Sequence, residues 1–530
     1  MNKWLKDSVV YQVYPLTYCD SNGDGIGDLK GIESKLDYML GLGVNVLWLN
    51  PFYPSTWTDG GYDVTDYYNV DPRFGTLKDF DDLVSACKKR GIRLVVDIVP
   101  GHTSYRHPWF LKSGEYARNE YSDRYIWTGD SFTSYRDKTI FGLHDRNGGY
   151  VINYYASQPA LNYGFNKLEE DKTDVYGGNT QGWKMHYTDE RLTPLREEII
   201  NVLRFWCARG VDGFRMDMAN SLVKECVFNS PNTEDIAGVI WVWDKIFTPI
   251  RNEFPDVAFI AEWVYPQNAV GKSGFDLDFF AHDTGPAYNG LFRNTPNSNL
   301  LRFFEKGENY FSQNGKGSIK ECLQECAEIY QAIDGKGVFS IPSGSHDQIR
   351  LAKDMQPSDL RTAFAFMLTF KHVPMIYYGD EIGLDYLPNI NKEGGYVRTG
   401  SRTPMQWTNG KNRGFSESDG ELYLPVNASP AQSVETQEQD ENSLLSLIKR
   451  LIKMRKEYAC LRFDGSLKIL SDGYPLVYER ADENNALLVA INPANENYTI
   501  KATYRKILYS ENYDEQTKTL SCGGIVIAEK

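Results

Sequence analysis

Eight short apolar runs recur along the chain and alternate, for the most part, with stretches of helical character. Alternation of this kind predicts a parallel sheet, and eight units predict a closed (β/α)8 TIM barrel. The runs are almost continuously apolar, as expected of strands that are buried on both faces. The sequence therefore predicts an α/β fold with barrel strands within residues 9–15, 45–51, 93–100, 213–217, 257–263, 275–280, 338–347 and 373–381.

Two parts of the chain depart from this alternation. Residues 103–190 are rich in Tyr, Gly, Asn and Asp and are too long for a simple loop, so we expect an inserted subdomain after the third strand. From residue 456 to residue 530, strand-like runs alternate with turns, which predicts a C-terminal antiparallel β-sandwich domain. The catalytic barrel then comprises residues 1–102 and 191–455.

Composition narrows the class of protein. The net charge of −14 argues against a nucleic-acid partner, and the chain contains no apolar run long enough to predict a transmembrane helix. The first residues lack the apolar core of a signal peptide, and the eight scattered cysteines are typical of free thiols, so we expect a cytoplasmic protein. The aromatic share of 14% suits a sugar-binding cleft, although most such residues should pack in the core. We expect no membrane partner, and either a monomer or a weak homo-oligomer.

Charged side chains gather where the predicted strands end. Asp217, Glu262 and Asp347 follow the fourth, fifth and seventh strands, and Arg215 stands two residues before Asp217. Any one of these acids could be an ordinary helix N-cap. Together they would converge at the catalytic end of a barrel, where burying three carboxylates without a purpose would be costly. Glycoside cleavage is a reaction that needs such a set, because one carboxylate attacks the sugar and another protonates the leaving oxygen.

Several motifs occur in a fixed order: GYDVTDY at 61–67, DIVPGH at 97–102, GFRMD at 213–217, FIAEW at 259–263, SHD at 345–347 and RTPMQW at 402–407. With these motifs the chain closely resembles the α-amylase family, glycoside hydrolase family 13, over nearly its whole length. The resemblance implies a barrel, an insert after the third strand and a C-terminal β domain, as the layout of the chain predicts.

The resemblance also implies roles for individual residues. Asp217 would be the nucleophile, Glu262 the general acid and then the base, and Asp347 a stabiliser of the transition state. The two carboxyl groups of Asp217 and Glu262 should then lie about 5–5.5 Å apart, as in a retaining enzyme. Substrate-binding roles fall to Tyr62 as a stacking platform, Asp63 as a hydroxyl ligand paired with Arg398, Arg215 beside the nucleophile, and His102 and His346 in the −1 subsite.

RTPMQW and the loop DSNGDGIGD at 20–28 are typical of the oligosaccharide-acting branch of this family, which includes oligo-1,6-glucosidases, α-glucosidases and trehalose synthases. We therefore expect a retaining α-glucosidase that cleaves glucose from short α-gluco-oligosaccharides by double displacement. The alternatives are an α-amylase or maltogenic amylase on longer α-1,4-glucans, a transglucosylase or isomerase of the trehalose-synthase type, and a non-catalytic transporter-associated homologue. Asn220 and Ser221 replace the Lys-His pair of typical endo-amylases. Met218 fits neither of the residue habits that track linkage, so the linkage preference stays open.

The loop at 20–28 is also the best metal site in the sequence. Its alternating carboxylates follow the spacing that begins an EF-hand, and oxygen ligands suit a hard cation. The family comparison favours one structural Ca²⁺, with Mg²⁺ as the alternative, bound by Asp20, Asn22, Asp24, Asp28 and the carbonyl of Ile26. A second calcium site, common in α-amylases between barrel and insert, is not expected, because Gly101 and Ala160 replace two of its oxygen donors.

Overall fold

A computed structural model describes residues 2–142, 144–168, 182–280, 286–292, 309–312, 317–353, 355–427 and 433–530. Eight parallel strands form one sheet in the order β10-β1-β2-β3-β6-β7-β8-β9. A parallel bridge between Pro342 and Met375, with a hydrogen bond from Ser343 N to Met375 O, joins the segment after β9 to β10 and closes the barrel. The strands are β1 (Val10–Val13), β2 (Val46–Leu49), β3 (Arg93–Ile98), β6 (Gly213–Met216), β7 (Ala258–Ala261), β8 (Leu277–Phe279), β9 (Val338–Ser340) and β10 (Met375–Tyr377).

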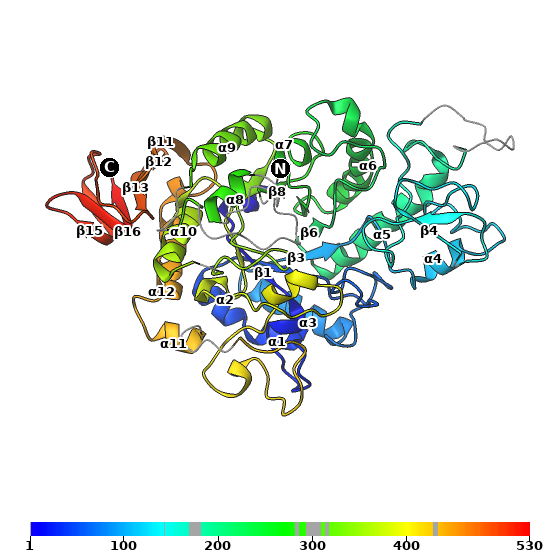
Figure 1. Ribbon diagram of the computed structural model, residues 1–530, viewed down its shortest axis with the longest axis horizontal. Helices are drawn as coiled ribbons and strands as arrows, with labels where there is room; N and C mark the ends of the chain where they lie inside the picture. The colour runs from blue at the N-terminus through cyan, green and yellow to red at the C-terminus, as the bar shows by residue number, and fades with distance from the viewer. Residues whose placement is uncertain are drawn as a thin grey trace.

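All eight predicted strands are confirmed, and helices surround them (Figure 1). Local sequence explains where the helices begin and end. A capping box of Thr76 and Asp79 starts α3, and Gly210, with φ of +98°, ends α5 in the left-handed conformation that glycine adopts without strain. The helices around the barrel are α1 (Leu29–Ser34), α2 (Leu36–Leu42), α3 (Leu77–Lys89), α5 (Thr193–Arg209), α6 (Ala237–Glu253), α7 (Pro266–Ala269), α8 (Pro286–Phe292), α9 (Lys320–Ile333), α10 (Pro357–Thr369), α11 (Val434–Glu438) and α12 (Leu444–Glu457).

The segment between β3 and α5 leaves the barrel on the side opposite the C-terminal sheet (Figure 1). It contains α4 (Pro108–Ser113) and a two-stranded sheet of β4 (Thr139–Phe141) and β5 (Gly149–Val151). Its small core consists of Ile126, Tyr135, Val151, Ala160 and Phe165. This is where the sequence predicts an insert, although Leu143 and residues 169–181 lie outside the described part. The exact domain limits stay a prediction.

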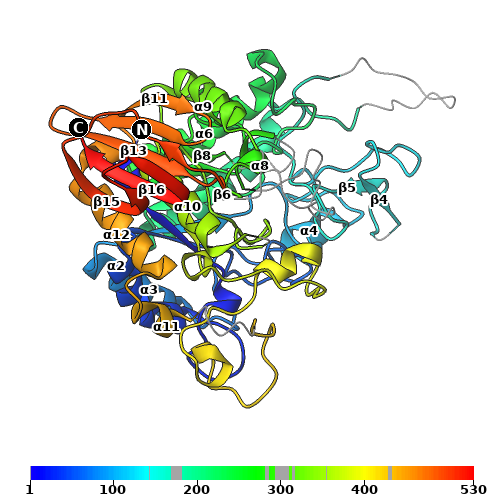
Figure 2. The same ribbon diagram turned by 60° about the vertical axis from the view of Figure 1, so that its left-hand side comes forward.

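The C-terminal strands form one antiparallel sheet in the order β11-β12-β13-β16-β14, with β15 paired to β16 (Figure 2). One face, with Leu487, Val489 and Ile527, joins the main core, and α10 contacts β13 and β16. Side chains such as Leu488, Val526 and Ala528 form a second cluster on the other face. The sheet thus buries both faces, one of them against the barrel. Its strands are β11 (Ser466–Asp472), β12 (Leu476–Ala481), β13 (Ala486–Asn492), β14 (Tyr498–Thr499), β15 (Lys506–Asp514) and β16 (Thr519–Glu529).

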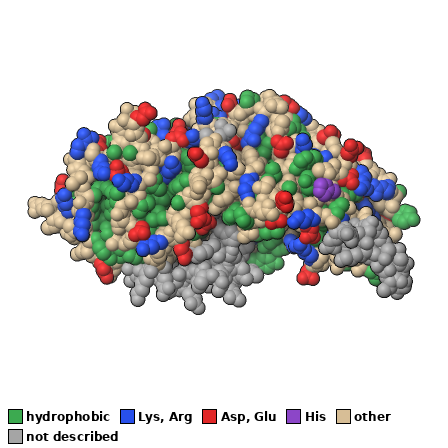
Figure 3. Space-filling view, turned by 90° about the horizontal axis from the view of Figure 1, so that it is seen from above, with side chains coloured by type: hydrophobic (Ala, Val, Ile, Leu, Met, Phe, Trp, Pro, Cys, Tyr) green, Lys and Arg blue, Asp and Glu red, His purple; other side chains and the backbone are tan. Residues whose placement is uncertain are grey.

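The charges on one face and the state of the cysteines can be described from the structure. On the face shown in Figure 3, acidic and basic side chains are interspersed, and no broad basic patch of the kind that binds nucleic acid is visible. None of the eight cysteines, all of which lie in the described ranges, forms a disulfide. Within those ranges, no helix combines the length and the apolar character needed to cross a membrane.

Candidate active site

Three carboxylates meet on one guanidinium at the carboxyl ends of the barrel strands. Arg215 Nη1 lies 2.6 Å from Asp97 Oδ1 and 2.8 Å from Asp217 Oδ1. Its Nη2 lies 2.8 Å from Glu262 Oε1. Arg215 is the third residue of β6, Asp217 follows that strand, and Glu262 follows β7. The predicted convergence of Arg215, Asp217 and Glu262 is therefore present, with Asp97 of β3 as a third acid on the same arginine.

One positive charge cannot balance three negative charges in a buried site. Burial, followed by the neighbouring Glu262 carboxylate, raises the pKa of Asp217 well above its usual range, although Arg215 opposes this rise. Because Asp217 and Glu262 contact the same guanidinium, the charge on each carboxylate acts on the other as well as on Arg215.

Glu262 is oriented by the backbone as well as by Arg215. The amide of Met218, next to Asp217, donates to Glu262 Oε2 at 2.7 Å. Met218 has a φ of +43°, an unfavourable conformation for a residue with a side chain. The sequence drew attention to Met218 only for its side chain. The structure shows that its backbone joins the segment after β6 to the carboxylate after β7.

Asp347, in the loop after β9, sits among three basic side chains. Its Oδ2 lies 3.1 Å from His346 Nε2, while Arg398 Nη1 and Arg402 Nη2 each donate to its Oδ1 at 2.9 Å. Burial alone would raise the pKa of Asp347, but the contacts with His346, Arg398 and Arg402 hold it well below its usual range. Asp347 is thus held as an anion, whereas burial and Glu262 disfavour the charged form of Asp217.

Tyr62 stacks on His346, and of these two residues only His346 lines the pocket. Their rings stack with centroids 5.2 Å apart and planes 7° apart, and the hydroxyl of Tyr62 lies 2.6 Å from His346 Nε2. The other ring nitrogen of His346 lies 2.9 Å from Gln12 Nε2. His346 thus fixes Tyr62 through both its ring face and its hydroxyl, so the ring is oriented before a sugar binds.

His102 lies next to the backbone of Tyr62 and does not line the pocket. Its Nε2 lies 3.1 Å from the carbonyl of Tyr62, and its Nδ1 lies 3.1 Å from Asn153 Nδ2. Burial lowers the pKa of His102 to about 4, so the ring is neutral at physiological pH. Both nitrogens are engaged with the protein, and His102 therefore supports Tyr62 in this structure.

One predicted pairing is wrong. Arg398 Nη2 donates to Asp59 Oδ1 at 2.9 Å, whereas Asp63 is fully buried and receives a hydrogen bond from Ser157 Oγ at 3.2 Å. The same Nη2 lies 3.1 Å from the hydroxyl of Tyr155. Asp59 and Asp63 stand four residues apart in one loop, and the sequence reasoning chose the acid adjacent to Tyr62. A turn with a hydrogen bond from Tyr62 N to Asp59 O turns Asp59, not Asp63, toward Arg398.

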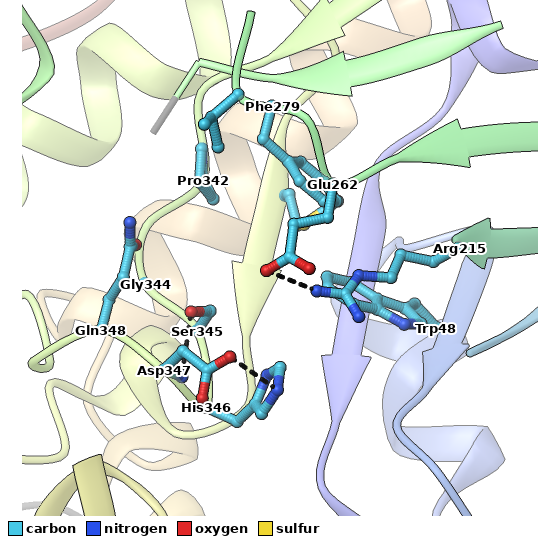
Figure 4. A pocket seen from close by; sticks show the side chains of 12 residues that line it. Trp48, Arg215, Glu262, Phe279, Pro342, Gly344, Ser345, His346, Asp347 and Gln348 are labelled. Carbon is cyan, nitrogen blue, oxygen red and sulfur yellow. Dashed lines mark hydrogen bonds and ion pairs between the residues drawn. The ribbon is translucent and has the colours of Figure 1, made fainter. Parts of the chain in front are cut away.

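A pocket opens between these groups (Figure 4). Glu262 and Asp347 point into it from opposite sides, and apolar rings line the space between them. Such a mixture of apolar walls and a few convergent polar groups is typical of small-molecule sites. It suits a sugar, whose ring has apolar faces and hydroxyl edges. The lining residues are Trp48, Arg215, Glu262, Val264, Phe279, Pro342, Gly344, Ser345, His346, Asp347, Gln348 and Met375.

A lysine occupies the place where the sequence predicts no second calcium. Lys224 Nζ donates to Asn153 Oδ1 at 3.1 Å and to Ser221 O at 2.8 Å. A Cβ on Gly101 would lie 2.9 Å from Asn153 Nδ2, so a side chain at position 101 would displace the Asn153 amide that binds Lys224. The absence of calcium here stays a prediction. The sequence reasoning missed Lys224, whose only signal is its position shortly after the GFRMD motif.

The loop at 20–28 braces a distant segment. Asp20 accepts hydrogen bonds from the amides of Gly23 and Gly25 at 2.7 and 2.8 Å and from Ser416 Oγ at 2.6 Å. Asp28 caps α1 through the amide of Gly31. No group of three or more acidic, histidine or cysteine residues is arranged for a metal within the described ranges. The metal assignment of Asp20, Asn22, Asp24, Ile26 and Asp28 therefore stays a prediction.

Comparison with known proteins identifies the family. Residues 12–464 match the α-amylase catalytic domain. The chain is 30% identical to an oligo-1,6-glucosidase of Parageobacillus thermoglucosidasius, with 92% of this chain and 90% of the relative covered. It is 31% identical to an oligo-1,6-glucosidase of Heyndrickxia coagulans, covering 93% and 92%. It is also 30% identical to a trehalose synthase/amylase of Mycolicibacterium smegmatis, covering 89% and 79%.

Solved structures show the same fold. An isomaltulose synthase of Erwinia rhapontici, determined with its substrate sucrose, superimposes with a TM-score of 0.80 over 99% of each chain. The sequence identity is 23%, so this similarity concerns the fold alone.

The buried ammonium of Lys224 leads to a test of stability against pH. Burial lowers its pKa from 10.5 to about 7, so the unfolded chain binds more protons than the folded chain between these values. Unfolding free energy should therefore rise with pH from about 7 to 10, by up to about 4 kcal/mol from this group. Denaturant titrations at several pH values should show that Lys224→Met flattens this rise, whereas exposed Lys88→Met does not. Equal slopes for wild type and Lys224→Met would contradict the assignment.

Proposed function

The chain belongs to the α-amylase family of glycoside hydrolases, and we propose that it is a retaining α-glucosidase that removes glucose from the ends of short α-gluco-oligosaccharides. The observation that carries this proposal is Arg398, whose guanidinium bridges Asp347 and Asp59 and contacts Tyr155. This bridge connects the loop after β9 with the loop after β2, on the Asp347 side of the site. We infer that this bridge closes the Asp347 side of the site to a longer chain, which favours action on chain ends.

In the proposed reaction, Asp217 attacks the anomeric carbon of a terminal glucose while Glu262 donates its proton to the departing glycosidic oxygen. Bond formation to Asp217 and bond cleavage leave a β-glucosyl ester on Asp217 and a carboxylate on Glu262. That carboxylate then takes a proton from water, and the water oxygen attacks the same carbon. The ester bond breaks, Asp217 leaves as a carboxylate, and glucose departs with its α configuration retained.

The surrounding residues prepare each of these events. Arg215 contacts both carboxylates, so it keeps Asp217 aligned and stabilises the negative charge that Glu262 acquires. The fixed anion Asp347 can accept hydrogen bonds from sugar hydroxyls and favour the positive charge that develops on the ring. Tyr62 offers an apolar ring face, held in place by His346. The short separation of Asp217 and Glu262 expected of a retaining enzyme stays a prediction, supported by their contacts with the two terminal nitrogens of one arginine.

A second candidate activity is transfer or isomerisation of a disaccharide. The relative from Mycolicibacterium smegmatis is a trehalose synthase/amylase, and transfer uses the same covalent intermediate with a sugar in place of water.

A cytoplasmic location is also part of the proposed function, supported by eight cysteines that form no disulfide.

A structural cation in the loop at 20–28 is the remaining part of the proposal. The side-chain donors are all oxygens, and an ionised carboxylate keeps lone pairs beyond those used by the loop amides. Asp20, Asn22, Asp24 and Asp28, with the carbonyl of Ile26, would hold Ca²⁺ or Mg²⁺, whose charge would offset that of the three acids. Such an ion would stabilise the loop that braces residues 415–423 through Asp20 N to Phe415 O and Tyr423 N to Gly25 O, both 2.9 Å.

Product analysis tests the proposed activity. Incubation with maltose, isomaltose, sucrose, trehalose and maltoheptaose, followed over time by chromatography, should release glucose from the start, in the α configuration. Asp217→Asn should lower turnover at least about a thousandfold with an unchanged melting temperature, because the nucleophile is lost and the shape is kept. Early mixed oligosaccharides from maltoheptaose would show internal cleavage and refute the exo assignment. Conversion of maltose into trehalose without free glucose would favour the isomerase.

Chelation tests the cation. Removing divalent ions should lower the melting temperature by about 1 °C for each kcal/mol of lost binding energy in a chain of 530 residues, and added Ca²⁺ should restore it. The variant Asp24→Asn, altered at an exposed position of the loop, should start from the lower temperature and respond weakly to chelator. An identical melting curve with and without chelator would contradict the assignment of a bound ion.

A further inference from the structure

Asp278, in the middle of β8, is fully buried and serves the segment that follows Glu262. Its carboxylate accepts hydrogen bonds from three consecutive backbone amides. Oδ1 receives Trp263 N at 3.0 Å and Val264 N at 3.2 Å, and Oδ2 receives Tyr265 N at 2.9 Å. One side chain on a neighbouring strand therefore fixes the backbone immediately after the proposed general acid.

That backbone is strained. Val264 has a φ of +57°, a conformation that β-branched residues rarely adopt and that costs about 1–3 kcal/mol. Such a conformation persists only where the surroundings impose it. Here the carboxylate of Asp278 supplies the constraint, because it binds the amide of Val264 and the amides on both sides of it. Val264 also lines the pocket beside Glu262, so the strain lies within the site.

Glu262 is held from its other side by the segment after β6. Its amide donates to Met216 O at 3.0 Å, its carbonyl accepts from Ala219 N at 3.0 Å, and its Oε2 accepts from Met218 N. These contacts fix the backbone of Glu262 and one of its carboxylate oxygens. The direction of the chain after Glu262 depends on the turn at Val264, which Asp278 holds.

We propose that Asp278 is a positioning residue for the general acid: by holding the turn at Trp263–Tyr265, it aims the Glu262 carboxyl at the glycosidic oxygen. This inference rests on the proposed role of Glu262 in α-glucoside cleavage. Asp278 itself does not touch the substrate. Without its carboxylate the turn at Val264 relaxes, and Glu262 loses its alignment with the leaving group.

The chain provides a matched control immediately before the same strand. Asp276 lies two residues earlier and braces the beginning of β7 in a similar way, since its Oδ2 accepts from Phe259 N at 3.0 Å. Its Oδ1 accepts from Asn2 N at 3.0 Å, and it pairs with Arg251 at 2.9 Å. Asp276 is buried, as Asp278 is, but it acts at the end of β7 that lies away from Glu262.

The experiment compares two substrates that share the glucosyl group and carry leaving groups with different needs for an acid. Phenyl α-glucoside needs its leaving oxygen protonated, whereas α-glucosyl fluoride departs with little help. We expect Asp278→Asn to lower kcat/KM at least about tenfold on the phenyl glucoside and less than about twofold on the fluoride, the pattern of a misaligned acid. Glu262→Gln should show the same pattern more strongly. Asp276→Asn should change both substrates by equal factors.

The outcomes separate this inference from the function on which it rests. If the wild-type protein cleaves neither compound, the α-glucosidase proposal fails and this inference fails with it. If the wild type cleaves both and Asp278→Asn loses equal factors on both, only the positioning role is overturned. Should Asp278→Asn not fold, adding Val264→Gly removes the strained residue and is expected to restore folding with the same substrate pattern. Failure of that double variant to fold would show a role in the fold alone and would overturn the proposal.

Discussion

The site depends on one buried guanidinium. Arg215 contacts Asp97, Asp217 and Glu262 from β6, and its positive charge offsets the cost of bringing the three carboxylates together. One positive charge balances only part of their negative charge, so burial and Glu262 still raise the pKa of Asp217. The barrel supplies the geometry for this arrangement, since it brings the ends of β3, β6 and β7 side by side.

The surroundings of Asp347 have the opposite effect on its carboxyl group. Asp347 is surrounded by His346, Arg398 and Arg402, which favour its charged form, whereas burial and Glu262 disfavour the charged form of Asp217. The two environments therefore shift the pKa values of these acids in opposite directions. Positive φ angles at Met218 and Val264 flank the two proposed catalytic carboxylates, and the rigid barrel around them bears that strain.

Much of this could be predicted from the sequence. Strand runs such as 93–100 and 257–263 are strongly apolar and end in acids, so both the barrel and the convergence of Asp217, Glu262 and Asp347 follow from periodicity and known barrel geometry. Residues in loops were harder, because their orientation depends on turns rather than on periodicity. Asp59 and Asp63 look equivalent in the sequence, and only the turn before Tyr62 decides which one meets Arg398. The contacts of Lys224 and Asp278 were not predicted for a related reason: their partners come from other elements, and no local sequence pattern indicates them.

The central claim is that the reaction passes through a covalent bond to Asp217. A ring-fluorinated α-glucosyl fluoride forms such an intermediate quickly and releases it slowly, so it can be trapped, and mass spectrometry of peptic fragments locates the label. This account predicts one fluoroglucosyl group per chain, attached to Asp217 in the peptide containing GFRMD. A label on another residue, or no label together with release of the β anomer of glucose from a natural substrate, would contradict it.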